Sequence, residues 1–299
     1  MLRIALNITA LIAIFALLPA RAQTAPLQLV ATTTIVADMV KKVGGERVEV
    51  TALMGPGVDP HLYRASAGDL TTLRTNQGVF YNGLHLEGKM VDILAQLPGV
   101  ALGECLEPEQ LINNPSFPGS HDPHIWFDVQ LWSQTVLCVE KELTRLDPAG
   151  ASYYRAQAQA YRAELEQLDA WVKSEIARLP PERRVLVTAH DAFHYFGRAY
   201  GLEVIGLLGV STASEASASD VAQLAQTIAT RKIPAIFVET SVPERYNKAL
   251  QAAVEARGFA TKLGPPLYSD ALGTSDGPAR SYVGMIQTNV RSIVGALEE

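Results

Sequence analysis

Short apolar runs of strand length recur along this chain, and a polar or helix-like stretch follows each of them. Such alternation is typical of parallel α/β sheets, in which helices connect successive strands. The runs fall into two groups, so the sequence predicts an α/β protein of two lobes, each with a parallel sheet. The runs lie at 27–33, 47–53 and 78–82, then at 184–188, 203–208, 235–240 and 259–263.

A long amphipathic stripe separates the two groups of runs. Its apolar residues recur at steps of three and four, which predicts one face of a helix about 40 Å long. Prolines at 148 and at 180–181 bound the helix. We therefore predict an N-terminal lobe at 23–147, a linking helix at 148–179 and a C-terminal lobe at 180–299. The stripe consists of Tyr154, Ala158, Tyr161, Leu165, Leu168, Val172, Ile176 and Leu179.

Residues 1–22 are typical of a cleaved export signal. Arg3 precedes an apolar run over 5–18, and Ala-Arg-Ala at 20–22 resembles a cleavage site. The alternative is a membrane anchor, but the run is shorter than the roughly 20 residues that span a bilayer. No cysteine follows the run closely, so we expect a periplasmic protein that is not a lipoprotein.

The two cysteines, Cys105 and Cys138, both lie in the predicted N-terminal lobe. Two cysteines in an oxidising compartment tend to pair, which favours a disulfide. Cys138 is flanked by the apolar Val136 and Val139, so a buried free thiol is the alternative. Both alternatives stay open, because pairing depends on a geometry that the sequence does not contain.

The charge balance excludes one class of partner. The chain has 25 Lys+Arg against 31 Asp+Glu, a formal net charge of −6. An acidic protein without a run of basic residues does not bind nucleic acid by the usual electrostatic route. We expect a monomer that binds no nucleic acid.

Three of the six histidines, His61, His124 and His190, lie in polar loops next to predicted strands or helices, and Asp270 follows the last strand. In open α/β sheets, ligands bind at the carboxyl ends of strands, here the cleft between the lobes. Imidazoles and a carboxylate converging there would suit a borderline divalent metal. Histidines after strands are also common as hydrogen-bonded structural residues, so the spacing by itself leaves both interpretations open.

An enzyme is the alternative from another functional class. A zinc-dependent hydrolase with the same three histidines and one aspartate would need an open position for water and a general base beside it. No motif supplies that base convincingly. His190 and His194 form H-D-A-F-H, similar to the H-E-x-x-H of zinc proteases, but Asp191 is one methylene shorter than the required glutamate.

The remaining polar candidates have secondary roles. We interpret His194 as a partly exposed helix residue that could support the site, and we expect His85 to pack against its own lobe. His121 is expected to be a solvated loop residue. Glu215 and Glu239 lie near strand ends and could orient ligand imidazoles, although Glu215 could equally cap a helix.

Five motifs resemble, in order, those of the zinc- and manganese-binding solute-binding proteins of metal ABC transporters (cluster A-I). The resemblance extends along nearly the whole mature chain. The motifs are Asp59-Pro60-His61-x-Tyr63, Tyr81-Asn82-Gly83-Leu84-x-Leu86-Glu87, Asp122-Pro123-His124-x-Trp126-x-Asp128, Thr188-Ala189-His190-Asp191-Ala192-Phe193 and Gly209-Val210-Ser211-Thr212-x-x-Glu215.

The resemblance implies two pseudo-symmetric α/β lobes on one rigid linking helix, and a metal site made of His61, His124, His190 and Asp270. It further implies a binding protein, not an enzyme, that delivers Zn²⁺ or Mn²⁺ to the membrane permease of an ABC importer. Two departures concern the metal. Residues 104–120 lack the histidines of zinc-specialised members, and His190 stands where manganese-specialised members often have glutamate. Three imidazoles with one carboxylate favour zinc over manganese.

Overall fold

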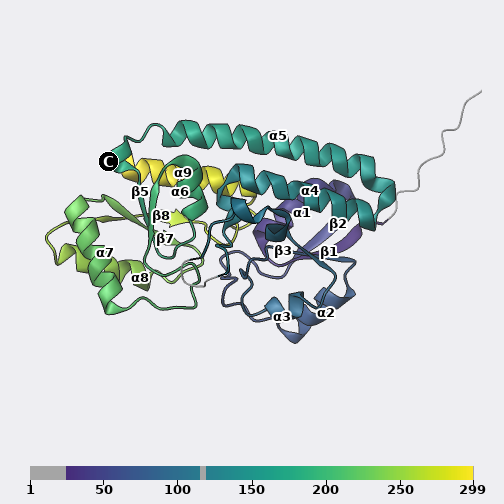
Figure 1. The fold of residues 1–299 in the computed structure, drawn as a ribbon, viewed down its shortest axis with the longest axis horizontal. Helices are drawn as coiled ribbons and strands as arrows, with labels where there is room; N and C mark the ends of the chain where they lie inside the picture. Colours follow the sequence, from purple (N-terminus) through teal and green to yellow (C-terminus); the bar gives the residue numbers. More distant parts are fainter. Residues whose placement is uncertain (1–24, 115–118, 299) are drawn as a thin grey trace, which may run out of the picture.

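The computed structural model describes residues 25–114 and 119–298, which form two parallel four-stranded sheets (Figure 1). The first sheet has the order β2-β1-β3-β4 and the second has the order β6-β5-β7-β8, so the two lobes repeat one topology. The predicted two-lobed α/β fold with parallel sheets is confirmed. The strands are β1 (Leu27–Ala31), β2 (Val48–Ala52), β3 (Gly78–Tyr81), β4 (Gly99–Ala101), β5 (Val185–Thr188), β6 (Glu203–Gly206), β7 (Ala235–Glu239) and β8 (Lys262–Leu267).

Helices connect the strands, and several begin at side chains that cap them. Ser66 and Ser217 each accept the backbone N–H of an aspartate three residues later, which satisfies donors that a helix start leaves unpaired. The helices are α1 (Thr34–Gly44), α2 (Ala67–Thr75), α3 (Val91–Leu94), α4 (Val129–Leu146), α5 (Ala151–Ile176), α6 (His194–Tyr200), α7 (Ala218–Arg231), α8 (Arg245–Glu255) and α9 (Tyr282–Glu298). Short 3-10 helices lie at Gly45–Arg47, Leu102–Cys105, Pro108–Gln110, Ile125–Phe127, Pro148–Gly150 and Pro181–Arg183.

Helix α5 lies along both lobes as one continuous element (Figure 1). Every residue of the predicted apolar stripe, from Tyr154 to Leu179, is buried. The stripe is buried because α5 packs against α4 and α1 of the first lobe and against α9 and α6 of the second. The lobe boundaries at 147 and 180 stay a prediction.

One hydrophobic core extends through both lobes. It joins residues of α1, α4 and α5 to residues of α6 and α9 and to the strands between them, while smaller clusters cover the outer faces of the sheets. Buried aromatic side chains also form hydrogen bonds between the lobes. Trp126 Nε1 donates to the Ser269 carbonyl at 3.0 Å, and the Tyr282 hydroxyl donates to the Trp126 carbonyl at 2.7 Å. The lobes are therefore held together by more than the linking helix.

Two strands differ from the sequence prediction. β4 was not predicted, because three residues are too short to show a periodic pattern. β8 starts at Lys262 and continues through Pro265 and Pro266, beyond the predicted 259–263. Proline lacks the N–H that a central strand must donate, and β8 tolerates two because it is the edge strand of its sheet.

Cys105 and Cys138 form a disulfide with their Cα atoms 6.5 Å apart. It joins the 3-10 helix Leu102–Cys105 to α4, so the pairing is confirmed and the free-thiol alternative was wrong. The predicted export signal at 1–22 lies outside the described residues. Within the described part of the chain, no helix is both long and apolar enough to cross a membrane.

Candidate metal centre

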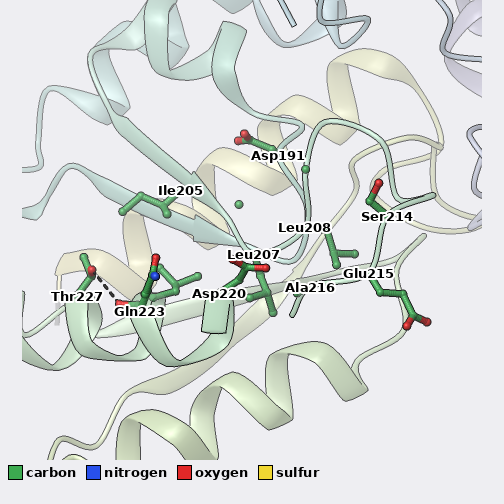
Figure 2. Close-up of a pocket in the computed structure, with 13 residues that line it drawn as sticks. Asp191, Ile205, Leu207, Leu208, Ser214, Glu215, Ala216, Asp220, Gln223 and Thr227 are labelled. Atoms are coloured by element: carbon green, nitrogen blue, oxygen red, sulfur yellow. Dashed lines mark hydrogen bonds between the residues drawn. The ribbon is translucent and has the colours of Figure 1, made fainter. Parts of the chain in front are cut away.

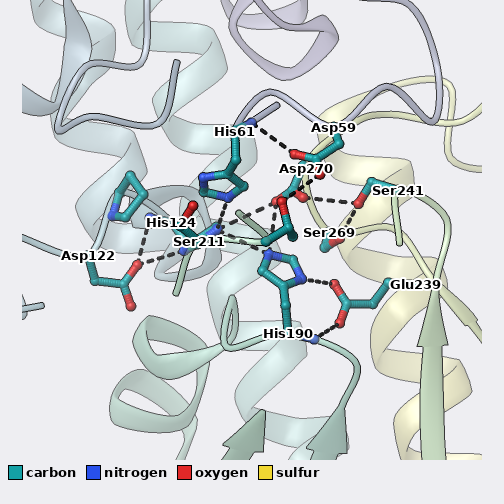
Figure 3. A network of polar contacts seen from close by, with 12 residues as sticks. Asp59, His61, Asp122, His124, His190, Ser211, Glu239, Ser241, Ser269 and Asp270 are labelled. Carbon is teal, nitrogen blue, oxygen red and sulfur yellow. Dashed lines mark hydrogen bonds and ion pairs between the residues drawn. The ribbon is translucent and has the colours of Figure 1, made fainter. Parts of the chain in front are cut away.

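The four predicted ligand residues meet between the two lobes (Figure 3). His61 lies in the loop after β2, and His124 directly precedes the 3-10 helix Ile125–Phe127. His190 follows β5 by two residues, and Asp270 follows β8 by three. Parallel strands bring their carboxyl ends to one edge of each sheet, and both edges face the cleft between the lobes.

The ligand atoms surround a common point. His124 Nε2 lies 3.3 Å from His61 Nε2 and 3.4 Å from His190 Nε2. Asp270 Oδ1 lies 3.5 Å from Nε2 of both His124 and His190. All four atoms lie within 4.8 Å of one another, an arrangement that no other group of His, Cys, Asp and Glu shows in the described residues.

Buried carboxylates hold two of the imidazoles from behind. Asp122 Oδ1 lies 2.7 Å from His124 Nδ1, and Glu239 Oε2 lies 2.6 Å from His190 Nδ1. Asp122 Oδ1 and Glu239 Oε1 also accept the backbone N–H of the same two histidines. A carboxylate on Nδ1 directs Nε2 of the ring into the site and makes it a better ligand.

Asp270 is held in the same way by hydroxyl groups. The Ser241 hydroxyl lies 3.0 Å from Asp270 Oδ2 and 2.9 Å from the Ser269 hydroxyl (Figure 3). Asp270 Oδ1 is left to face the imidazoles. Ser269 also accepts, through its backbone carbonyl, the Trp126 hydrogen bond that joins the lobes. Asp270 is thus connected, through its neighbour Ser269, to Trp126 of the first lobe.

The carboxylates raise the pKa values of two of the three histidines. Burial opposes the charged imidazole, but Asp122 and Asp270 outweigh it and raise the pKa of His124 to about 9. Glu239 and Asp270 likewise overcome burial and raise the pKa of His190 well above its usual value. Burial dominates at His61, with a contribution from the two neighbouring imidazoles, and lowers its pKa to about 3.

The two aspartates of the centre stay ionised. Burial disfavours the carboxylate of Asp122, but His124 outweighs it and lowers the pKa of Asp122 to about 2. His190 and His124 in the same way hold the pKa of Asp270 well below its usual value, against the effect of burial. The centre therefore offers one anionic and three imidazole ligands, with further negative charge behind them, which is a donor set for a divalent cation.

Of the two glutamates considered from sequence, only Glu239 contacts a predicted ligand, His190. Glu215 is exposed, and Ser217 caps the following helix α7 instead. Asp122 was not singled out as a support for His124, although it precedes that ligand by two residues in the D-P-H motif. Asp59 has the same relation to His61, whose backbone N–H it accepts at 2.8 Å. The repeated D-P-H motif was the signal for both contacts.

The other three histidines lie outside the centre. His85 is exposed with a φ of 65°, so the expectation that it packs against its lobe was wrong. His121 is half-buried, not a fully solvated loop residue. His194 begins α6 as a partly exposed residue, and its ring nitrogens lie 3.4 Å from Asp122 Oδ2 and 3.0 Å from Asp191 Oδ1. His194 therefore contacts the carboxylate that supports His124.

Two cavities lie near the centre. A cavity of about 530 Å³ lies in the second lobe between β6 and α7 (Figure 2), and none of the four ligand residues lines it. A smaller cavity of about 250 Å³ reaches His61 and is lined by residues of both lobes. The smaller cavity, unlike the larger one, is lined by one of the four predicted ligands, His61.

Comparisons with known proteins find similar proteins over nearly the whole chain. A family model described as zinc-uptake complex component A, periplasmic (ZnuA) matches residues 29–296. The zinc-binding protein TroA of Treponema pallidum is 48% identical over 273 residues, which cover 90% of this chain and 88% of TroA. The solved structure of periplasmic TroA superposes with a TM-score of 0.88 at 46% identity, covering 91% of this chain and 99% of that one.

A second relative corrects the expected localisation. The manganese-binding lipoprotein MntA of Bacillus subtilis is 42% identical over 277 residues, 91% of this chain and 90% of MntA. The exclusion of a lipoprotein was therefore wrong, because relatives this similar are lipoproteins. The exclusion relied on where cysteines fall after residues 1–22, and that segment precedes both the described residues and the region that the family model matches.

Proposed function

Because this chain belongs to the family of periplasmic zinc-uptake components, we propose that it binds a divalent ion, Zn²⁺ or Mn²⁺, and delivers it to the permease of an ABC importer. We further propose that His61, His124, His190 and Asp270 are the ligands. The observation that carries the proposal is the convergence of these four buried side chains on one point.

The spacing of the ligand atoms supports a four-coordinate ion. A tetrahedral ion with bonds of about 2.05 Å places neighbouring ligand atoms about 3.3 Å apart. Four of the six separations between ligand atoms are 3.3 to 3.5 Å, and all six are within 4.8 Å. The spacing of His124, His190 and Asp270 therefore already suits an ion of this kind.

Zn²⁺ is the better chemical match to this donor set, because imidazole suits zinc while manganese favours oxygen ligands. The relatives do not distinguish the two ions, since TroA is named as zinc-binding and MntA as manganese-binding. We propose zinc as the preferred ion. Only one ligand is anionic, which holds the ion less tightly than a thiolate cage would and favours its release to a partner.

The family consists of transport components rather than enzymes, so the hydrolase alternative has no support. Its members serve an ABC transporter with a permease and an ATPase. We propose in addition that this protein is a monomer. We also propose that it binds no nucleic acid, because its formal net charge is −6. Light scattering on the purified protein tests the first point, and a DNA-binding titration at low salt tests the second.

Alanine substitution at each of the four positions tests the site. His61→Ala, His124→Ala, His190→Ala and Asp270→Ala should each weaken Zn²⁺ binding in a chelator competition by more than the roughly 10- to 100-fold typical of a supporting residue. The controls are His85→Ala and His121→Ala, which lie outside the centre and should bind as the parent does. An Asp270→Ala protein with the affinity of the parent would remove Asp270 from the site.

A further inference from the structure

An ion in the proposed site could not leave without movement of the protein. His61 is 3% exposed, Asp270 is 1% exposed, and His124 and His190 are fully buried. With the four proposed ligands this buried, almost none of the centre faces water. Exchange of the ion therefore requires part of the surrounding wall to open.

The cavity of about 250 Å³ lies against one of the proposed ligands. It reaches His61 and lies between Leu84 and His85 of the first lobe and Val210 and Ser211 of the second. The opening of this cavity depends on how firmly the loop that carries Val210 and Ser211 is held against the loop that carries His61.

A hydrogen bond joins those two loops within two residues of the cavity lining. The hydroxyl of Thr212, the residue after Ser211, donates to Asp59 Oδ2 at 2.6 Å. The other oxygen of the same carboxylate, Oδ1, accepts the backbone N–H of His61 at 2.8 Å. Asp59 thus links a residue of the second lobe directly to the backbone of a proposed ligand of the first.

This contact differs from the hydrogen bonds that buried aromatic side chains form between the lobes. Tyr195, Trp126 and Tyr282 form theirs at fully or almost fully buried side chains within the shared core. Thr212 and Asp59 are half-buried, so water can replace their hydrogen bond when it breaks. The loops at Thr212 can therefore separate while the shared core stays packed.

We propose that Thr212 is a positioning residue that keeps the cavity wall closed over the bound ion and sets the rate at which the ion enters and leaves. The inference rests on the proposed metal-binding function. Thr212 is not itself one of the proposed ligands. Removing its hydroxyl should therefore change the rates of ion binding and ion release in the same direction and leave the equilibrium affinity nearly unchanged.

Two substitutions at this position separate the hydroxyl from the rest of the side chain. Thr212→Val keeps the shape and removes the donor, and Thr212→Ser keeps the donor. Stopped-flow mixing of the full Zn²⁺-loaded protein with excess chelator measures release, and mixing of the metal-free protein with buffered Zn²⁺ measures binding. Thr212→Val should accelerate both rates about tenfold, the effect of losing one hydrogen bond from the closed state. Thr212→Ser should keep the rates of the parent.

The outcomes distinguish this inference from the proposed function. A parent protein that takes up no Zn²⁺ would overturn both. A parent that binds, with Thr212→Val rates within twofold of it, would overturn the role of Thr212 alone. Faster release with unchanged binding would also overturn it, because Thr212 would then stabilise only the bound state. Thermal unfolding of the metal-free variants shows whether they are folded before the rates are compared.

Discussion

The carboxylate of Glu239 holds His190 at two points, with Oε2 2.6 Å from the ring Nδ1 and Oε1 2.8 Å from the backbone nitrogen. Both residues are buried, one after β5 and the other at the end of β7, which are neighbouring strands of the second sheet. The glutamate fixes both the position and the tautomer of a proposed ligand. It should contribute to affinity without touching the ion.

Glu239→Gln tests this contribution. The amide has the same shape as the carboxylate but lacks its charge, so Zn²⁺ affinity in a chelator competition should fall about 10- to 100-fold. The control is Glu215→Gln, a second glutamate of the same lobe that is exposed and should bind as the parent does. Equal affinities of Glu239→Gln and the parent would show that His190 needs no support from this carboxylate.

Metal affinity should depend on pH over a window higher than the ordinary histidine range. The pKa of His124 is raised to about 9 and that of His190 is also raised, so an ion must displace a proton from each at neutral pH. The pKa of His61 is about 3, so it releases none. We expect Zn²⁺ affinity to rise from pH 6 to pH 9, with about two protons released per ion at pH 7. A flat affinity profile with no proton release would contradict this.

The stability of the metal-free protein should have a maximum near pH 6.5. Groups with raised pKa, such as His124, stabilise the fold fully below their unfolded pKa of about 6.5, and this stability is lost as pH rises through about 9. His61 has a lowered pKa. Below about pH 6.5 the unfolded chain therefore binds a proton at His61 that the folded protein does not bind, and the stability of the fold decreases toward pH 3. Urea unfolding of the chelator-treated protein at pH 5, 6.5 and 8.5 measures the trend, and a maximum at 8.5 would refute the His124 assignment.

Removing the disulfide should lower stability and leave the site intact. Replacing both cysteines, Cys105→Ser with Cys138→Ser, should reduce the free energy of unfolding by about 2–4 kcal/mol, because the bridge closes a loop with a sequence separation of 33. Denaturant titration measures the loss, and Zn²⁺ affinity serves as the control that should not change. Two free thiols in the denatured, unreduced parent would show that the bridge does not form.

Zn²⁺ should bind more tightly than Mn²⁺. A site of nitrogen and oxygen ligands generally binds Zn²⁺ more tightly than Mn²⁺, which is the weakest of the first-row divalent metals, and three imidazoles add to that preference. Competition of both ions against the same chelator at pH 7.5 measures the ratio. Tighter Mn²⁺ binding would overturn the assignment of zinc as the preferred ion.

The sequence by itself determined the two sheets and the apolar face of α5, because strands and helices show their own periods. It offered His61, His124, His190 and Asp270 only as candidates, and the family resemblance joined them into one proposed site. The tertiary structure alone decided that Glu239 stands behind His190. Glu239 and His190 are 49 residues apart in the chain, and they meet because β5 and β7 are neighbouring strands. The hydrophobic periodicity of the sequence does not show which strands are neighbours.

The contacts between the two lobes were also not predicted from the sequence, because they join segments far apart in the chain. A helix joining two lobes was visible as a stripe of apolar residues, but the shared core that α9 completes against α5 and α1 was not. The hydrogen bond from Thr212 to Asp59 joins residues 153 positions apart, and neither residue shows in its own neighbourhood that it has this partner. Contacts between distant segments depend on how the lobes pack, and that packing exists only in the folded protein.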